Sequence, residues 1–555
     1  MKLRILSILI ILSLLLNACN SIQNLIPSEK LTISIVYGSE KQAWLDPLIK
    51  QYNDANNKTS GGKIIVVQAT AMGSIESVRG IIDGSIQPTV WSPASSIYIP
   101  VANSEWKKSH TDDLVTGTPK DLVLSPVVIA MWRPMAQALG WPNKAIGWQD
   151  VAQLSTSKEG WAAYQHPEWG SFKFGHTHPN YSNSGIVSII AETYAGLNKQ
   201  KGLTENDLNS PDLKDFMAKV ESSVIHYGAS TGFFGDRMFE RGPSYLSAAV
   251  LYENLIVAQE TKRINGQSSQ IPVVAIYPKE GTFWSNHPYV ILNTAWVTAE
   301  QKEAAQLFET FLLDKPQQLK ALEYGFRPAD PSIPLTAPLD SEHGVDTTQP
   351  KTILELPSAP VIEGIQTLWR QEKKPVDLFV VMDISGSMRG DKITTARDSL
   401  LKFINKLDDR DRLRIDLFND QITTLTPLTA LGDKRQQVLD SVSGIFEQSN
   451  TSLYDATLKA YEDLQTEGDP THIRAIVILS DGEDTSSAAT LDQVTTKITG
   501  SENEGGNAIK VFTIAFGSDA NADILKSIAE PSGGKQYDSS PETIQKIYDD
   551  IATFF

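Results

Sequence analysis

Short apolar runs alternate with amphipathic segments in two long stretches of the chain, and this pattern predicts two mixed α/β regions. Apolar residues recur at every second position in a half-buried strand and at every third or fourth position in a helix. In the first region the pattern predicts strands over residues 31–37, 63–68, 89–91 and 122–131, and helices over 75–82 and 301–313. Because strands and helices alternate with short connections, we expect a sheet with parallel strands.

The second region begins near Asp377 and carries longer apolar runs. The pattern there predicts strands over 377–382, 413–418, 473–479 and 510–515, and helices over 392–407, 434–446, 452–464, 491–499, 522–528 and 543–555. Uninterrupted runs of Val, Ile and Leu are typical of strands that are covered on both faces. The fold class expected for the chain is therefore α/β, with a doubly wound, Rossmann-like sheet in the second region.

Residues 331–374 join the two regions. This segment is rich in proline and acidic residues and has no sustained periodicity until a short amphipathic stretch at about 361–372. Proline-rich sequence of this kind favours a linker over a packed element. We therefore predict a linker with one short helix.

The N-terminus has the pattern of an export signal. Two basic residues, Lys2 and Arg4, precede an apolar run over 5–16 that is short for a membrane span. The following Leu16-Asn17-Ala18-Cys19 resembles the cleavage box of bacterial lipoproteins. The resemblance implies a signal peptide over 1–18, lipid modification of Cys19 and a tether over 19–30; an ordinary cleaved signal with an incidental cysteine is the alternative.

Later segments are too short or too polar to span a membrane, so we expect the protein outside the cytoplasm, lipid-anchored on the periplasmic side or the outer surface. The length of 555 residues implies two or three domains. The boundaries expected are 31–330 for the first domain and 375–555 for the second. Cys19 is the single cysteine, which excludes an internal disulfide and a cysteine-based zinc site. A formal net charge of -17 disfavours nucleic-acid binding.

Oxygen-bearing side chains follow two of the predicted strands in the second domain. Asp383, Ser385 and Ser387 follow the strand 377–382, and Asp481 follows the strand 473–479. In open α/β sheets, ligands bind where the carboxyl ends of such strands meet at a switch in strand order. Two adjacent carboxylates repel each other unless a cation lies between them. Because these are hard oxygen ligands, Mg²⁺ or Mn²⁺ is the expected ion.

A third motif, Asn450-Thr451-Ser452-Leu453-Tyr454-Asp455-Ala456, lies between these two in the sequence. Together the three motifs resemble the von Willebrand factor type A domain and its metal-ion-dependent adhesion site. The resemblance implies that Ser385, Ser387 and Thr451 bind the metal directly, while Asp383 and Asp481 act partly through water. It also implies an open coordination position for an acidic residue of a protein partner.

Two features near this site stand apart from the ligand set. The family commonly has two glycines where Ser449 and Asn450 stand before Thr451. Asp455 and Asp484 are expected to stabilise a helix end and to face solvent, and are not assigned as ligands.

The first domain, over 31–330, resembles an extracellular solute-binding protein of the two-lobed, periplasmic-binding type. The resemblance rests on short motifs in order along the chain, at 35–39, 125–130, 147–150, 178–185, 276–282 and 324–328. It implies a small ligand in the cleft between the lobes.

Several serines are candidates for contacting that ligand. Helix starts offer free N–H groups and a partial positive charge that suit an oxyanion. The candidates are Ser39, Ser74, Ser92, Ser95, Ser182 and Ser184. The alternative is that they only cap helices, at about 1 kcal/mol each. The pair His176 and His178 could bind a metal, but the sequence offers no evident third ligand.

These features predict a lipid-anchored binding protein that takes a small solute in one domain and docks a protein partner through a metal in the other. The alternative is the substrate-binding component of an ABC-type uptake system with an accessory type A domain. We do not expect an enzyme, because the chain has no His/Glu zinc motif, no Gly-x-Ser-x-Gly elbow and no phosphate loop.

Overall fold

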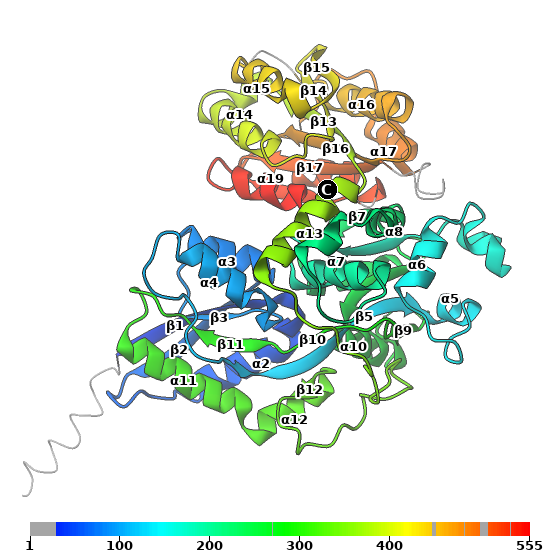
Figure 1. Ribbon diagram of the computed structural model, residues 1–555. Helices are drawn as coiled ribbons and strands as arrows, with labels where there is room; N and C mark the ends of the chain where they lie inside the picture. The colour runs from blue at the N-terminus through cyan, green and yellow to red at the C-terminus, as the bar shows by residue number, and fades with distance from the viewer. Residues whose placement is uncertain (1–28, 269, 447–450, 482, 500–508, 533) are drawn as a thin grey trace, which may run out of the picture.

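The computed structural model describes residues 29–268, 270–446, 451–481, 483–499, 509–532 and 534–555 (Figure 1). The expected signal peptide, Cys19 and nearly all of the expected tether lie outside these residues. Among the described helices, none combines the length and the hydrophobicity that crossing a bilayer requires.

The first lobe is built on a five-stranded sheet in the order β2-β1-β3-β11-β4. Its strands are β1 (Lys30–Gly38), β2 (Ile64–Met72), β3 (Val90–Ser92), β4 (Lys120–Asp121) and β11 (Pro288–Ile291). Strand β1 runs parallel to β2 and β3, whereas β11 runs antiparallel to β3 and β4. Its helices are α2 (Gln42–Asp54), α3 (Ser74–Ile82), α4 (Ile99–Trp106), α11 (Ala299–Leu313) and α12 (Lys315–Glu323).

The second lobe is built on a seven-stranded sheet in which β10-β5-β8-β6-β7 form the main path and β9 and β12 also pair with β5. Its strands are β5 (Val123–Trp132), β6 (Phe174–Thr177), β7 (Val224–Gly228), β8 (Ala248–Tyr252), β9 (Val273–Ile276), β10 (Trp284–Ser285) and β12 (Arg327–Pro328). Its helices include α5 (Arg133–Ala138), α6 (Trp148–Ser155), α7 (Asn183–Gly196), α8 (Pro211–Glu221), α9 (Thr231–Arg241) and α10 (Glu253–Ile264). The chain thus enters this lobe along β5 and returns to the first lobe at β11.

The segment after β12 packs on the second lobe and does not extend as a free linker. Leu339, Val345 and Leu354 are buried, and Leu354 N donates to the Thr282 carbonyl at 2.9 Å. Helix α13 (Ala359–Glu372) then packs on α7 and α8. The apolar residues scattered among the prolines therefore complete the surface of the lobe.

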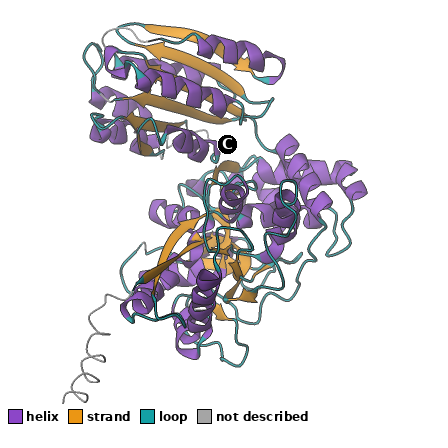
Figure 2. Cartoon of the chain, turned by 90° about the vertical axis from the view of Figure 1, so that its left-hand side faces the viewer, coloured by secondary structure: helices purple, strands orange, loops and turns teal. Residues whose placement is uncertain are grey.

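The C-terminal domain contains a six-stranded sheet in the order β15-β14-β13-β16-β17-β18, and it lies at one end of the molecule (Figure 2). Its strands are β13 (Val376–Asp383), β14 (Arg412–Phe418), β15 (Ile422–Ala430), β16 (Ile473–Ser480), β17 (Lys510–Phe516) and β18 (Gln536–Ser539). Only β15 pairs antiparallel with its neighbour. The strand order reverses between β13 and β16, which is the switch point expected of a doubly wound sheet.

Helices cover both faces of this sheet, as the apolar strands predicted. Alternate residues of a strand point to opposite faces. Leu378 and Val380 of β13 accordingly share a core with α14 (Asp391–Ile404), α15 (Arg435–Ser443) and α19 (Ile544–Ala552). Phe379 and Val381 share a second core with α16 (Leu453–Glu467), α17 (Leu491–Thr499) and α18 (Ala522–Ala529).

The end of the chain joins the two domains. Helix α19 lies between the C-terminal sheet and the second lobe (Figure 1). The Phe555 carbonyl accepts a hydrogen bond from Lys373 Nζ at 2.8 Å, and the Phe554 carbonyl accepts one from Tyr227 N at 3.3 Å. The C-terminal residues are therefore part of the contact with the first domain.

Candidate functional site

The first part of the candidate metal site is the turn that follows β13. Asp383 is the last residue of the strand and is fully buried, and its Oδ1 accepts a hydrogen bond from Ser385 N at 2.8 Å. The hydroxyl oxygens of Ser385 and Ser387 lie 2.9 Å apart. Ser385 is buried and Ser387 is exposed, so the pair extends from the sheet edge to the surface. The turn therefore presents one carboxylate and two hydroxyls together.

The second part is the end of β16, which runs parallel to β13. Met382 pairs with Leu479, so Ser480 lies beside Asp383, and its hydroxyl donates to Asp383 Oδ2 at 2.6 Å. Asp481 follows, buried, and its backbone carbonyl accepts from Asn521 N at 2.6 Å. Its Oδ1 is buried and has no hydrogen-bond partner within the described residues. An unpaired buried carboxylate oxygen is costly unless a cation or water satisfies it.

The surroundings of Asp383 disfavour its ionised form. Burial chiefly raises the pKa of Asp383 to about 6, and the charge of Asp481 adds to this; the hydrogen bonds from Ser385 and Ser480 act in the opposite direction. A carboxyl with this pKa is costly to keep ionised at neutral pH. A divalent ion would remove that cost by neutralising both acidic groups.

The loop after β16 connects Thr451 with this region. Thr451 is buried, its N–H donates to Thr485 Oγ1 at 3.1 Å, and its carbonyl accepts from Thr485 N at 2.9 Å. Ser449 and Asn450, the departure from the family pattern, lie outside the described residues. Thr451 is therefore held against the loop that follows Asp481, and the structure supplies hydroxyl and carboxylate oxygens of the kind that Mg²⁺ or Mn²⁺ takes.

Asp455 and Asp484 have local partners of their own. The Asp455 carboxylate accepts hydrogen bonds from the N–H groups of Ala488 and Ala489 at 2.8 and 2.9 Å. Asp484 Oδ1 accepts from Ser487 Oγ at 2.6 Å. Asp455 therefore holds the loop 484–489 against α16, and Asp484 forms a hydrogen bond within that loop.

In the first domain, three of the six candidate serines meet where the two lobes touch. They are joined by the two residues that begin α9, Ser230 and Thr231. Ser39 of the first lobe donates to Ser230 Oγ at 2.9 Å. Ser182 and Ser184 of the second lobe lie 3.1 and 2.8 Å from Thr231 Oγ1. The structure thus brings Ser39, Ser182 and Ser184 to the start of α9, where Ser39 pairs with Ser230 and the other two pair with Thr231.

The other three serines have different surroundings. Ser74 Oγ accepts from Ala94 N at 3.0 Å, and Ser95 Oγ accepts from Ile97 N at 3.2 Å at the start of a short 3-10 helix. Ser95 therefore caps the short helix, as the capping alternative predicted, whereas the Ser74 hydroxyl joins the start of α3 to the segment that follows β3. Ser92 is 1% exposed, and its hydroxyl has no partner in the part of the chain that the structure describes.

Sequence reasoning missed a buried charged group beside these serines. Lys41 is 0% exposed, and its Nζ lies 2.9 Å from Glu40 Oε1 and 3.3 Å from His287 Nδ1. Burial alone would raise the pKa of Glu40, but Lys41 and His287 outweigh it and hold that pKa at about 2. Burial, followed by the charge of Lys41, lowers the pKa of His287 to about 4. The only local sign of this group in the sequence is the polar run 285–287 directly before β11.

The network continues to the second lobe and contains unsatisfied polar atoms. Lys41 Nζ donates to the Pro93 carbonyl next to Ser92 at 3.3 Å. The His287 ring packs on Tyr252, whose hydroxyl accepts from Asn183 Nδ2 at 3.0 Å. Ser92 Oγ, His287 Nε2 and Asn183 Oδ1 are buried without partners among the described residues. A small polar ligand between the lobes would satisfy such atoms.

Both regions match families of known proteins. The family described as bacterial extracellular solute-binding protein matches residues 33–327, and the von Willebrand factor type A domain matches residues 377–550. An uncharacterized protein of Mycobacterium tuberculosis is 25% identical over 323 residues, which cover 52% of this chain and 42% of that protein. Inter-alpha-trypsin inhibitor heavy chain H3 of Mus musculus is 27% identical over 192 residues, which cover 32% of this chain and 21% of that protein. The chain spans less than half the length of these curated relatives.

Solved structures resemble the two domains separately. A periplasmic thiamin binding protein aligns with a TM-score of 0.44 and 10% identity, covering 62% of this chain and 98% of that one. A von Willebrand factor type A structure from Catenulispora acidiphila aligns with a TM-score of 0.29 and 20% identity, covering 33% of this chain and 42% of that one.

The expected fold class and both expected family resemblances are confirmed. Because the first match covers more than half of the 555 residues, the chain belongs to the bacterial extracellular solute-binding proteins and carries a C-terminal von Willebrand factor type A domain.

Proposed function

We propose that this protein is a non-enzymatic binding protein of the cell exterior, anchored by lipid on Cys19. Its first domain takes a small polar solute between the lobes, and its type A domain docks an acidic residue of a protein partner. The observation that supports this most directly is the unpaired, buried Asp481 Oδ1 beside the Asp383 carboxyl and the paired serine hydroxyls.

In the type A domain, the ion would be Mg²⁺ or Mn²⁺, held by the side chains that the sequence analysis assigned. These are Asp383, Ser385, Ser387, Thr451 and Asp481. When bound, the ion supplies positive charge and a coordination position that a carboxylate can take. The chain itself supplies the rigidity, because two of these residues end neighbouring parallel strands.

In the first domain, the interlobe network favours an anionic or strongly polar solute, such as an oxyanion. Lys41 brings a buried positive charge, and the start of α9 brings the partial positive charge of a helix. The orphaned Ser92, Asn183 and His287 atoms supply further hydrogen-bonding capacity. Of the candidate serines, we place Ser39, Ser92, Ser182 and Ser184 at this site and assign Ser74 and Ser95 to local stabilisation.

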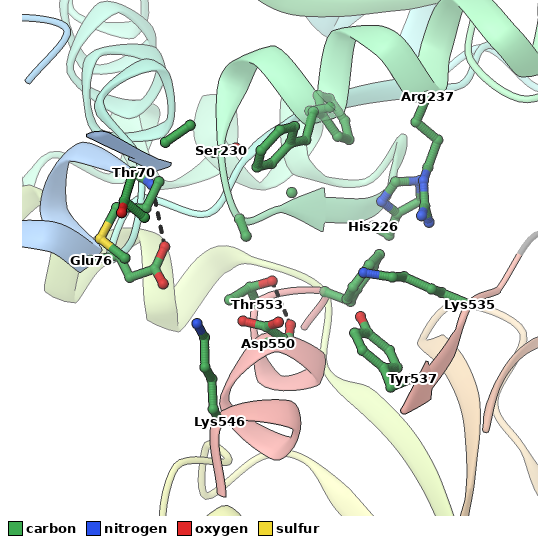
Figure 3. Close-up of a pocket in the computed structure, with 18 residues that line it drawn as sticks. Thr70, Glu76, His226, Ser230, Arg237, Lys535, Tyr537, Lys546, Asp550 and Thr553 are labelled. Atoms are coloured by element: carbon green, nitrogen blue, oxygen red, sulfur yellow. Dashed lines mark hydrogen bonds between the residues drawn. The ribbon is translucent and has the colours of Figure 1, made fainter. Parts of the chain in front are cut away.

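The two binding events are proposed to influence each other, because residues of the type A domain and of both lobes line one cavity. A cavity of about 260 Å³ is lined by Thr70 and Glu76 of the first lobe, by Ser230 and Arg237 of the second, and by Asp550 of α19 (Figure 3). A relative movement of the lobes would change the shape of this cavity and the surface against which α19 packs. Equal partner affinity in the presence and absence of the solute would disprove this coupling.

The metal proposal is tested by calorimetric titration of the purified chain with MgCl₂. Wild type should bind one equivalent, and Asp481→Ala should lose this binding because a buried ligand is gone. The matched control is Asp440→Ala, which removes an exposed aspartate of α15. Unchanged titrations in Asp481→Ala would overturn the proposal.

A second candidate function is the substrate-binding component of an ABC-type uptake system, and the two-lobed family match favours it. It predicts that cells lacking only residues 375–555 still accumulate the solute. Loss of uptake in that deletion, with the first domain still folded and exported, would argue against an accessory role for the type A domain.

A further inference from the structure

A second cluster of metal-binding side chains lies in the core of the second lobe, far from the type A site in the sequence. His176 comes from β6, Glu192 from α7 and Glu221 from α8, and all three are 0% exposed. One ligand atom from each lies within 4.8 Å of the other two. Nothing in the solute-binding or docking proposals uses these residues.

The hydrogen bonds of His176 determine which ring nitrogen is free to act as a ligand. Nδ1 lies 2.8 Å from the Thr177 carbonyl, which can only accept, so Nδ1 carries a proton. Nε2 lies 3.0 Å from Glu221 Oε1. In a neutral ring with the proton on Nδ1, Nε2 carries a lone pair that faces a carboxylate oxygen of Glu221, and one metal ion can take both atoms as ligands. Donation from the other ring nitrogen to a carbonyl is the usual support of a metal-bound histidine.

Glu192 supplies the independent observation. Both of its carboxylate oxygens are buried and lack a hydrogen-bond partner within the described part of the chain. Glu221, in contrast, accepts from the Tyr227 hydroxyl at 2.6 Å. A fully buried carboxylate without any partner is among the most costly arrangements in a protein core.

The surrounding charges do not compensate Glu192. Burial, and then the charge of Glu221, raise its pKa well above the ordinary value for a glutamate. Lys374 is a partly exposed cation on which the Glu221 charge acts, and burial lowers its pKa to about 8. Without an ion, the Glu192 side chain therefore stays buried beside a second acidic group, with no hydrogen-bond partner among the described residues.

We propose that His176, Glu192 and Glu221 bind one divalent transition-metal ion, Zn²⁺ or Mn²⁺, that fastens β6, α7 and α8 together. The ion neutralises both carboxylates. An imidazole and two carboxylates suit these ions better than Mg²⁺. Ligand atoms about 2.1 Å from a shared ion are at most about 4.2 Å apart, so small side-chain adjustments are enough to close the cluster.

The proposed site uses one histidine of the His-x-His pair that the sequence offered as a possible metal-binding pair. His178 is not the second ligand, because β6 ends at Thr177 and His178 packs on Trp369 with ring centroids 4.9 Å apart. His178 Nδ1 instead accepts from Asn180 N at 3.1 Å. The missing ligands come from two later helices.

The test separates this site from the type A site by using Asp481→Ala as the background. This variant and the double variant Asp481→Ala/Glu192→Gln are refolded from denaturant with ZnCl₂ or MnCl₂, desalted and analysed by elemental mass spectrometry. The single variant should keep about one ion per chain and the double variant close to none, since a ligand must be deprotonated and present to hold the ion.

Thermal unfolding provides the second measurement. Refolding Asp481→Ala with a chelator in place of the metal should lower its unfolding midpoint, because an ion that binds only the folded state stabilises it. The double variant should respond to neither addition. Should Glu192→Gln fail to fold, the comparison of the single variant with and without metal still decides the matter. A metal-free Asp481→Ala with equal midpoints, or an ion retained by the double variant, would overturn the proposal.

Discussion

The substitution Gly232→Ala tests how tightly the two lobes pack against each other at the start of α9. Gly232 lies in the first turn of α9, and its N–H donates to Ser39 Oγ of the other lobe at 3.1 Å. A Cβ at this position would lie 2.8 Å from both the backbone carbon and the hydroxyl of Ser39 and 2.9 Å from Glu40 N. Backbone atoms cannot rotate away, so Gly232→Ala must push the lobes apart.

The size of the effect follows from these distances. Relief of a 2.8 Å contact to an ordinary van der Waals separation needs a shift of roughly 0.6 Å across the interlobe contact. Overpacking of this kind costs about 1–3 kcal/mol. If that cost falls on the closed arrangement, lobe opening becomes more frequent by about 5- to 150-fold.

Native-state hydrogen exchange can measure this opening directly. The amides of Ile75 and Glu76, at the start of α3, both donate to the Tyr181 carbonyl across the interlobe contact at 3.1 Å. These two amides should exchange faster in Gly232→Ala by the factor above. The matched control is Gly235→Ala on the same helix, where a Cβ would meet Leu251 at an ordinary 3.4 Å. Equal exchange of the two amides in both variants would refute the reasoning.

Further predictions concern the buried charges. In a chelator, the free energy of unfolding should fall by about 3 kcal/mol as the pH rises through about 6, because the pKa of Asp383 is about 6 in the folded protein and its ordinary value is 3.8. Since the folded pKa of Asp383 is the higher one, its contribution to the free energy of unfolding is complete below about pH 3.8 and is lost above about pH 6. Asp383→Asn should flatten the dependence of this free energy on pH, measured by denaturant titrations. A pH dependence unchanged by that variant would contradict the prediction. Lys41→Met should lower stability by about 3–5 kcal/mol because it leaves Glu40 buried without its cation. Lys41→Met/Glu40→Gln should recover part of that loss in thermal unfolding, and no recovery would show that Lys41 stabilises the lobe by packing alone.

In the C-terminal domain, the positions and burial of four of the six described strands could be predicted from the sequence, for a physical reason. A run such as 376–383 is buried at every position because both faces of a parallel sheet are covered, and the largely apolar pattern that results is local. Strands β15 and β18 were missed because both are sheet edges: β15 is rich in threonine and contains Pro427, and β18 has only four residues. Edge strands need less apolar sequence and so leave a weaker pattern.

The grouping of the metal-site residues was also accessible from the sequence. Parallel strands end at the same edge, so Asp383 and Asp481 had to lie close once both strands were assigned to neighbouring positions in one sheet. The Lys41 group could not be predicted in this way, because its partner His287 is 246 positions further along the chain.

Local periodicity therefore says which side of an element faces the core, but it does not say which elements meet there. The partners of Ser39 and His176 were decided by how α7, α8 and α9 pack on the sheet and against the other lobe. Serines that look alike as helix starts became either backbone caps or members of an interlobe network through that packing alone. Such contacts join residues far apart in the chain, and only the folded arrangement brings them within hydrogen-bonding distance.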